Sequence, residues 1–238
     1  QVRVDELQEL FQQLGFRRFI DEVKTLVDHT SAVETPAGVE RSWHLIDTPK
    51  RFEQFLSDLK QHRRFCVDLE TTGLDAVQAD IVGWAISWDG IDGYYLPVQG
   101  PTGQAVLDAD TVRDALRPII EAPDIEICNQ NIKYDMLVLR RAVIALQGVG
   151  VDSMVGSYLL DAGARSHGLD ELAQRYLHHE MIPISDLIGK GKAQIKISAV
   201  DVEKVAEYAA EDAQVAWQLC GRIAAELKRE GLWDLYWD

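Results

Sequence analysis

The chain has 238 residues, of which 47% are hydrophobic and only seven are proline, so it can form a sizeable folded domain and does not have the composition of a disordered chain. No apolar run approaches the ~20 residues that a membrane-spanning helix needs, and the start, QVRVDELQEL, lacks the profile of a signal peptide, so we expect a cytoplasmic protein with no membrane partner. A formal net charge of −15 argues against a broad basic surface for nucleic acid, although a protein that binds a short single-stranded end needs only a local basic groove.

The cysteines and histidines show no zinc-binding pattern. Cys66, Cys128 and Cys220 lie far apart without a Cys-x-x-Cys pair, which also argues against a disulfide framework. The adjacent residues His178 and His179 point apart on a helix and have no third ligand at helical spacing. We therefore expect buried, reduced thiols.

A helical segment and a linker precede the main domain. Apolar residues recur at spacings of three and four through residues 1–30, which predicts helix, and turn-forming residues at 30–38 predict a linker that ends near Arg41. We therefore divide the chain into a helical segment with its linker, residues 1–41, and a main domain, residues 42–238.

The first half of the main domain has the pattern of a sheet. A short strand is predicted at 43–46, and Thr48 is a suitable N-cap for a helix over 51–60. Runs of β-branched and aromatic residues, separated by Gly and Asp turn signals, predict three more strands at 64–70, 81–88 and 93–98. Consecutive strands joined by tight turns indicate an antiparallel meander.

The second half alternates between helix and strand. Helices are predicted at 110–120 and 132–142, and strands at 125–128 and 150–152, which indicates parallel additions to the same sheet. The expected fold class is therefore α/β, a mixed sheet flanked by helices. The remaining predicted elements are helices at 153–161, 168–177 and 201–229 and a basic loop at 180–200.

Two carboxylates, Asp68 and Glu70, lie at the end of the predicted strand 64–70. Their spacing of two places both side chains on one face of the strand. At the carboxyl end of a strand in an α/β sheet, that face opens toward the crevice where ligands bind. The alternative is a strand end that simply faces solvent.

Further candidates come from helices. Asp135 follows strand 125–128 at the start of a helix, where it could face the crevice or merely complement the helix dipole. Tyr208 and Asp212 lie four residues apart on one face of the last helix, beside small alanines that allow close approach to a sheet. Glu211 falls on another face, and we expect it in solvent.

Four carboxylates that can converge are the ingredients of a two-metal site. Two divalent ions can hold a scissile phosphate and activate water for an in-line displacement. Oxygen ligands favour Mg²⁺ or Mn²⁺ over zinc, and a nearby phenol could orient the attacking water.

Taken in order, Asp68-x-Glu70, the NIKYD segment 131–135 and Tyr208-x-x-x-Asp212 resemble the motifs of the DEDD exonuclease superfamily, in its tyrosine-bearing DEDDy branch. The resemblance covers about residues 42–230 and is closest to the 3′-5′ proofreading domains of bacterial family A polymerases, the DNA polymerase I family. It implies a ribonuclease H-like fold and hydrolysis of the terminal phosphodiester of single-stranded DNA with two Mg²⁺ or Mn²⁺ ions.

The resemblance also implies roles for individual residues. Tyr208 would position the attacking water, and Leu74 would wedge against the terminal bases. The metal ligands would be Asp68, Glu70, Asp135 and Asp212, and the further strand contacts would be Thr71, Gln130, Asn131 and Tyr134. Independently of the resemblance, Lys190 and Lys192 in the basic loop could hold a phosphate backbone or could simply be solvated.

Neighbouring domains are implied as well. Polymerases of this family carry an upstream 5′-nuclease domain that ends in helix, which gives residues 1–41 a place, and the C-terminal GLWDLYWD resembles the junction into a polymerase domain. We therefore expect the proofreading part of a bacterial, nucleoid-associated polymerase whose partner is a single-stranded DNA 3′ end. The alternatives are a DEDDy ribonuclease that trims RNA 3′ ends and a non-catalytic module that binds single strands.

Overall fold

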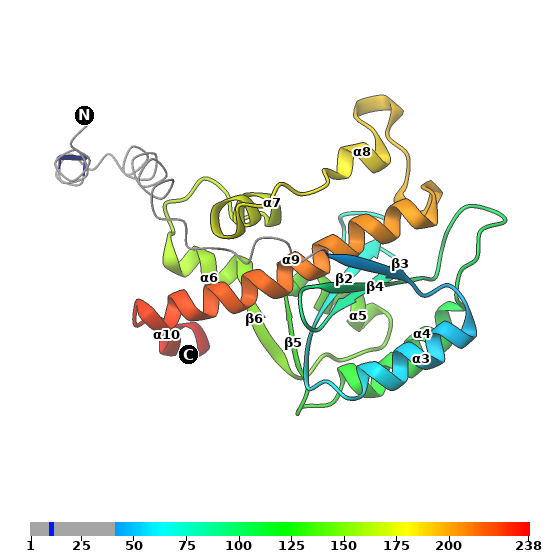
Figure 1. The fold of residues 1–238 in the computed structure, drawn as a ribbon, viewed down its shortest axis with the longest axis horizontal. Helices are drawn as coiled ribbons and strands as arrows, with labels where there is room; N and C mark the ends of the chain where they lie inside the picture. The colour runs from blue at the N-terminus through cyan, green and yellow to red at the C-terminus, as the bar shows by residue number, and fades with distance from the viewer. Residues whose placement is uncertain (1–9, 12–40) are drawn as a thin grey trace. The chain divides into compact units, whose positions relative to one another are not determined.

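The computed structural model describes residues 10–11 and 41–238, and its elements carry the labels of Figure 1. The helix predicted over residues 1–30, apart from Leu10 and Phe11, and the linker up to residue 38 lie outside the described residues. The division of the chain near residue 41 stays a prediction. Within the described part of the chain, no helix has both the length and the apolar character needed to cross a membrane.

Six strands form one mixed sheet in the order β1-β4-β3-β2-β5-β6. The strands are β1 (Ser42–Leu45), β2 (Arg64–Thr71), β3 (Ile81–Ser87), β4 (Asp92–Pro97), β5 (Glu126–Asn129) and β6 (Val149–Asp152). β2, β3 and β4 form the antiparallel meander, while β5 and β6 add in parallel beside β2, as predicted. β1 pairs in parallel with β4 at the opposite edge.

Helices follow the strands and cover both faces of the sheet (Figure 1). The helical elements are α3 (Pro49–Leu59), α4 (Ala109–Ile120), α5 (Ile132–Arg141), α6 (Ser153–Leu160), α7 (Leu169–Leu172), the π-helical turn η1 (Ala173–Leu177), α8 (Ile184–Ile188), the 3-10 turns η2 (Gly191–Ala193) and η3 (Ile197–Ala199), α9 (Val202–Arg229) and α10 (Trp233–Trp237). Thr48 caps α3 as predicted, because its hydroxyl accepts a hydrogen bond from the Arg51 amide.

The segment 180–200 contains more regular structure than the predicted loop. It forms α8, η2 and η3, because its apolar residues have a core to pack on. Leu187 and Ile188 lie partly buried against the cluster beneath α9, and Ile197 is buried in it. Three lysines and two glycines obscure this short apolar pattern in the sequence.

Alternation along β2 assigns its side chains to two cores. Val67 and Leu69 are 2% and 6% exposed and pack with α3, α4 and α5, which confirms their predicted burial. Cys66 faces the other way, into the cluster formed with α9. Asp68 and Glu70, at the same alternation as Cys66, therefore lie on the face of the sheet that α9 covers.

α9 approaches the sheet closely because its inner face is built from alanines. Ala206, Ala209 and Ala213 are fully buried, and α9 packs against β1, β2, β3, β4 and β5. A Cβ atom added to Gly93 on β4 would lie 2.7 Å from the Ala210 Cβ atom, so a larger residue at either position would move the helix away. The small residues thus bring the polar side chains of α9 next to those of β2.

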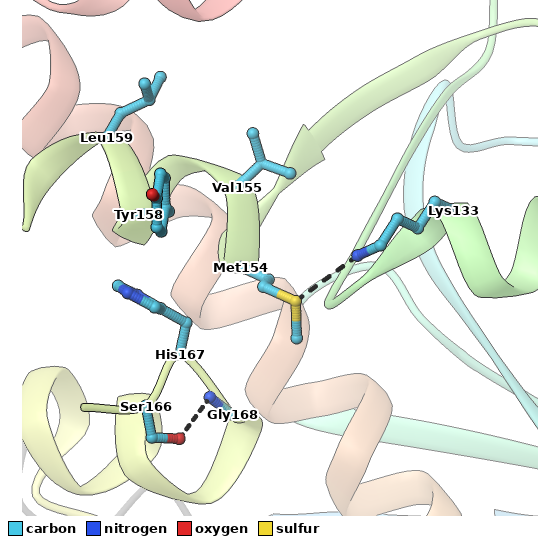
Figure 2. A pocket seen from close by; sticks show the side chains of 8 residues that line it. All are labelled: Lys133, Met154, Val155, Tyr158, Leu159, Ser166, His167 and Gly168. Carbon is cyan, nitrogen blue, oxygen red and sulfur yellow. Dashed lines mark hydrogen bonds between the residues drawn. The ribbon is translucent and has the colours of Figure 1, made fainter. Parts of the chain in front are cut away.

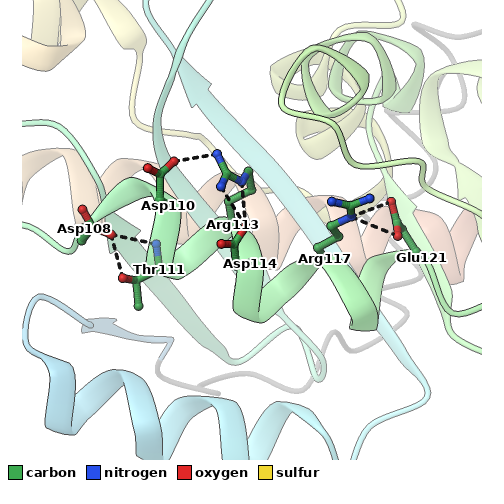
Figure 3. A network of polar contacts seen from close by, with 7 residues as sticks. All are labelled: Asp108, Asp110, Thr111, Arg113, Asp114, Arg117 and Glu121. Atoms are coloured by element: carbon green, nitrogen blue, oxygen red, sulfur yellow. Dashed lines mark hydrogen bonds and ion pairs between the residues drawn. The ribbon is translucent and has the colours of Figure 1, made fainter.

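α4 carries a row of ion pairs on its exposed side (Figure 3). Asp108 caps the helix by accepting from the Thr111 amide at 2.8 Å, and Arg113 and Arg117 pair with acids of the same helix and its C-cap. Exposed pairs of this kind are screened by solvent, so they add little to the stability of the fold. None of these residues is a candidate site residue.

Candidate metal centre

Three carboxylates from two elements converge between the sheet and α9. β2 contributes Asp68 and Glu70, and α9 contributes Asp212. Each offers one oxygen atom, and these three atoms all lie within 4.8 Å of one another. Glu70 is 8% exposed and Asp212 9%, whereas Asp68 is half-buried. The acids at the end of β2 therefore meet the acid on α9, as predicted.

The fourth carboxylate, Asp135, joins this group from the first turn of α5. It is 4% exposed, and its Oδ1 atom accepts a hydrogen bond from the Leu69 amide at 3.2 Å. Its Oδ2 atom accepts from the Asn129 side chain at 2.9 Å, and the same amide nitrogen donates to Asp68 Oδ1 at 3.3 Å. Asp68 is thus adjacent both to the group with Asp212 and to Asp135.

Burial and mutual repulsion make these acids reluctant to ionise. Burial raises the pKa of Asp68 to about 6, although the hydrogen bond from Asn129 opposes the change. Burial and the charge of Asp68 raise the pKa of Glu70 to about 8. Burial first, and then the neighbouring carboxylates, raises the pKa values of Asp135 and Asp212 well above the usual range.

Within residues 41–238, no positive side chain forms an ion pair with these carboxylates. Among the ion pairs of residues 41–238, none brings a Lys, Arg or His nitrogen within 4.0 Å of any of the four acids. Hard oxygen atoms held this close are the donor set that Mg²⁺ and Mn²⁺ prefer. The residues therefore fit a divalent cation, whose charge would offset the repulsion.

Tyr208 lies on the same face of α9, one turn before Asp212. Its side chain is partly buried against the core under α9, and the charge of Asp212 acts on its hydroxyl. Burial and the charges of Asp212 and Glu70 raise the pKa of Tyr208 well above its usual value. The phenol therefore keeps its proton and can orient a neighbouring oxygen atom, but it cannot act as a base.

The loop after β2 is tied to α5 and presents Leu74. The Tyr134 hydroxyl lies 2.6 Å from Thr71 Oγ1 and donates to the Gly73 carbonyl at 2.5 Å. Leu74, the next residue, is 98% exposed, although leucine is usually buried. Thr71, Tyr134 and Leu74 therefore lie together at the end of β2.

Gln130 and Asn131 occupy the turn between β5 and α5. The Gln130 side chain donates to the His167 carbonyl at 2.6 Å and accepts from the Ser153 hydroxyl, so both ends of its amide already have partners. Asn131 adopts a left-handed conformation with φ of 59°, which asparagine tolerates better than most residues. Both residues shape the turn from which Asp135 projects.

A hollow of about 510 Å³ lies next to this turn (Figure 2). Its wall includes Lys133, Met154, Tyr158 and His167, and none of the four acids lines it. Lys190 and Lys192 are exposed around η2, and no hydrogen bond or ion pair of the described residues joins them to the acids. The metal-ligand, water-positioning and strand-binding roles stay predictions.

The prediction that Glu211 is solvated is wrong. Its carboxylate accepts from the Ile182 amide at 2.7 Å and lies 2.8 Å from His179 Nε2, which also contacts Arg41. Glu211 faces the chain that returns from η1, an arrangement that helix periodicity does not reveal. The three cysteines are free and buried, as expected.

Asn129 was not singled out in the sequence, yet it contacts two of the four acids. It is the last residue of β5 and is fully buried. The parallel register that pairs Cys66 with Cys128 places it beside Asp68. A polar residue at the end of a strand adjacent to the acidic strand is the signal that could have found it.

A family described as 3′-5′ exonuclease matches residues 43–228. DNA polymerase I of Pseudomonas aeruginosa is 36% identical over 220 residues, which cover 88% of this chain and 24% of the polymerase. The chain thus spans about a quarter of the length of that relative.

Two solved structures share the fold. Brucella melitensis NrnC with bound Mg²⁺ matches with a TM-score of 0.60 and 18% identity, covering 83% of this chain and 86% of NrnC. Escherichia coli RNase D, an exoribonuclease involved in structured RNA processing, matches with a TM-score of 0.59 and 15% identity, covering 80% of this chain and 46% of RNase D. The predicted ribonuclease H-like fold is confirmed.

Proposed function

The chain belongs to the 3′-5′ exonuclease family, and we propose that it is the proofreading part of a DNA polymerase I, which removes nucleotides one at a time from the 3′ end of single-stranded DNA. The observation that supports catalysis is the meeting of four carboxylates that form no ion pair with a Lys, Arg or His of the described part of the chain. The choice of DNA rests on the resemblance to DNA polymerase I. A covalently linked polymerase domain, an upstream 5′ nuclease and a place at the bacterial nucleoid belong to the same proposal.

Two divalent ions, Mg²⁺ or Mn²⁺, fit the arrangement of the acids. Asp68, Glu70 and Asp212 would hold one ion, and Asp68 with Asp135 would hold the second, because Asp68 is adjacent to both groups. Bound ions would polarise the scissile phosphate and stabilise the leaving oxygen.

The remaining side chains would position the reactants. The Tyr208 phenol, which keeps its proton, would orient the attacking water by a hydrogen bond. Leu74 would pack against the last base, and Thr71 with Tyr134 would fix the loop that presents it. Gln130 and Asn131 would contact the strand beside them, and Lys190 and Lys192 would attract its phosphates from η2.

A digestion assay tests the proposal directly. A 5′-labelled single-stranded DNA is incubated with the protein in Mg²⁺, Mn²⁺ or EDTA. We expect a ladder of products shortened from the 3′ end in Mg²⁺ and in Mn²⁺, and intact DNA in EDTA. Asp68→Asn should remove the activity, whereas Glu207→Gln, an exposed carboxylate on α9, should keep it. DNA that stays intact in both metals would refute the proposal.

A second candidate is a ribonuclease that trims RNA 3′ ends. It is favoured by the fold that the chain shares with RNase D, an exoribonuclease involved in structured RNA processing. An RNA of the same sequence in the same assay separates the two, because rapid loss of RNA with intact DNA would establish the ribonuclease instead. A non-catalytic binding module would leave both intact and would bind them equally with EDTA and after Asp68→Asn.

A further inference from the structure

Asn129 sits between two acids of the metal centre rather than at its edge. It ends β5, is fully buried, and lies beside β2 through the parallel register of Cys66 and Cys128. Its side-chain nitrogen donates to Asp68 Oδ1 at 3.3 Å and to Asp135 Oδ2 at 2.9 Å. One amide group thus uses both of its N–H bonds on two separate carboxylates.

A hydrogen bond to the oxygen atom of the Asn129 side chain supports the orientation of this amide. Asn129 Oδ1 accepts a hydrogen bond from the Cys66 thiol at 3.4 Å. A rotated amide would turn Oδ1 toward the oxygen atoms of Asp68 and Asp135, where acceptors would face acceptors. The N–H bonds are therefore held toward the acids.

We infer that Asn129 is a positioning residue that sets the distance between Asp68 and Asp135 and so prepares the site for the second ion; this inference rests on the proposed function. The two carboxylate oxygens cannot lie further apart than the two hydrogen bonds to their common nitrogen allow. A neutral donor suits this place, because a Lys would neutralise the charge that attracts a cation, and an Asp would add a fifth acid. Residues that orient metal-binding carboxylates commonly change affinity or activity by about 10- to 100-fold when they are removed.

Asn129→Ala tests the inference by Mn²⁺ binding without DNA, measured by calorimetry, and by the Mg²⁺ concentration that half-activates DNA digestion. We expect weaker Mn²⁺ binding at one of the two ions and a half-activating Mg²⁺ concentration raised by about 10-fold or more. Excess Mg²⁺ should restore much of kcat, with little change in KM for DNA. A packing defect that left the ligands in place would lower the free energy of unfolding without weakening Mn²⁺ binding to the folded protein.

Gln214→Ala is the matched control. Gln214 is also a buried amide, and it bridges two acceptors, the carbonyls of Ser42 and Ile91 at 2.7 and 2.6 Å, on a side of α9 away from the acids. This variant should lose stability without a change in Mn²⁺ affinity. Asn129→Ser retains one hydrogen-bond donor, and its Mn²⁺ affinity should lie between those of wild type and Asn129→Ala. If Asn129→Ala does not fold, Asn129→Ser alone is compared with wild type.

Two failures can be told apart. If the wild type digests neither DNA nor RNA, the proposed function fails, whatever the Asn129 variants do. If the wild type is active and Asn129→Ala and Asn129→Ser bind Mn²⁺ as tightly as wild type, with the same half-activating Mg²⁺ concentration, only the positioning role is overturned.

Discussion

Replacing Glu70 with Gln should stabilise the metal-free protein at alkaline pH, although it removes a predicted ligand. Glu70 ionises with a pKa of about 8 in the folded protein and near 4.5 in the unfolded chain, because burial and Asp68 oppose its charge. Between about pH 4.5 and pH 8, folding is therefore coupled to the uptake of a proton by Glu70. The contribution of protonated Glu70 to the stability of the folded protein is fully present below about pH 4.5 and is lost as the pH rises through about 8. A glutamine amide is neutral at every pH, so the Glu70→Gln variant avoids the loss.

The size of the effect follows from the difference between the two pKa values. Each pKa unit corresponds to about 1.36 kcal/mol, so ionised Glu70 lowers the free energy of unfolding by up to about 5 kcal/mol above pH 8. Asp68 reduces this figure, because the two acids share the repulsion and relieving one relieves the other. We expect Glu70→Gln to gain about 2–4 kcal/mol at about pH 9 in EDTA and almost nothing at about pH 4.5.

Urea unfolding of wild type and Glu70→Gln at both pH values measures this gain. The exposed Glu207→Gln variant on α9 is the control and should show no comparable gain. With excess Mg²⁺ the order should reverse, because the cation binds the ionised wild-type site and stabilises the folded state by mass action. Equal stability of wild type and Glu70→Gln at about pH 9 in EDTA, or the same gain at both pH values, would refute the electrostatic account.

Other variants address the remaining side chains. Asp212→Asn should reduce DNA digestion by about 100-fold or more, the scale of losing one preorganised charge-stabilising group, and digestion near the wild-type rate would exclude it as a ligand. Tyr208→Phe should cost only about tenfold in kcat, since it removes one hydrogen bond worth about 1.4 kcal/mol, and a loss as large as that of Asp212→Asn would contradict a mere orienting role. Leu74→Ala should change the free energy of unfolding by about 0.5 kcal/mol or less while it slows removal of the terminal nucleotide, as measured by single-turnover digestion. Replacing Lys190 and Lys192 with Ala should reduce the salt dependence of single-strand binding by about 0.7 in log–log slope for each phosphate that the protein no longer neutralises, and an unchanged slope would mark both lysines as solvated.

Local rules predicted most of the scaffold. The cap at Thr48, the alternation that buries Val67 and Leu69, and the change from consecutive strands to strand-helix units all follow from short-range chemistry. The same alternation placed Asp68 and Glu70 on one face, and the alanines of α9 allowed Asp212 to reach them. These features depend on neighbours within a few residues, which a sequence displays.

The features that were missed depend on residues distant in the chain. β1 pairs with β4 rather than with β2, the next strand in the chain, and no local sequence pattern predicts this pairing. Glu211 is half-buried because the chain after η1 returns to it. Asn129 reaches the acids because β5 enters the sheet beside β2. Each required the register of two distant segments, which periodicity within one segment does not contain.

The acidic charge of the chain and a nucleic acid substrate are compatible because of how this site is built. Its four carboxylates repel phosphate as long as they lack a counter-charge, and no Lys or Arg among the described residues pairs with them. Bound divalent cations would turn the same place into the strongest local attraction for a phosphate. The affinity for a DNA 3′ end should therefore rise steeply with Mg²⁺ or Mn²⁺, whereas a site that bound DNA through surface lysines would weaken as divalent salt increased.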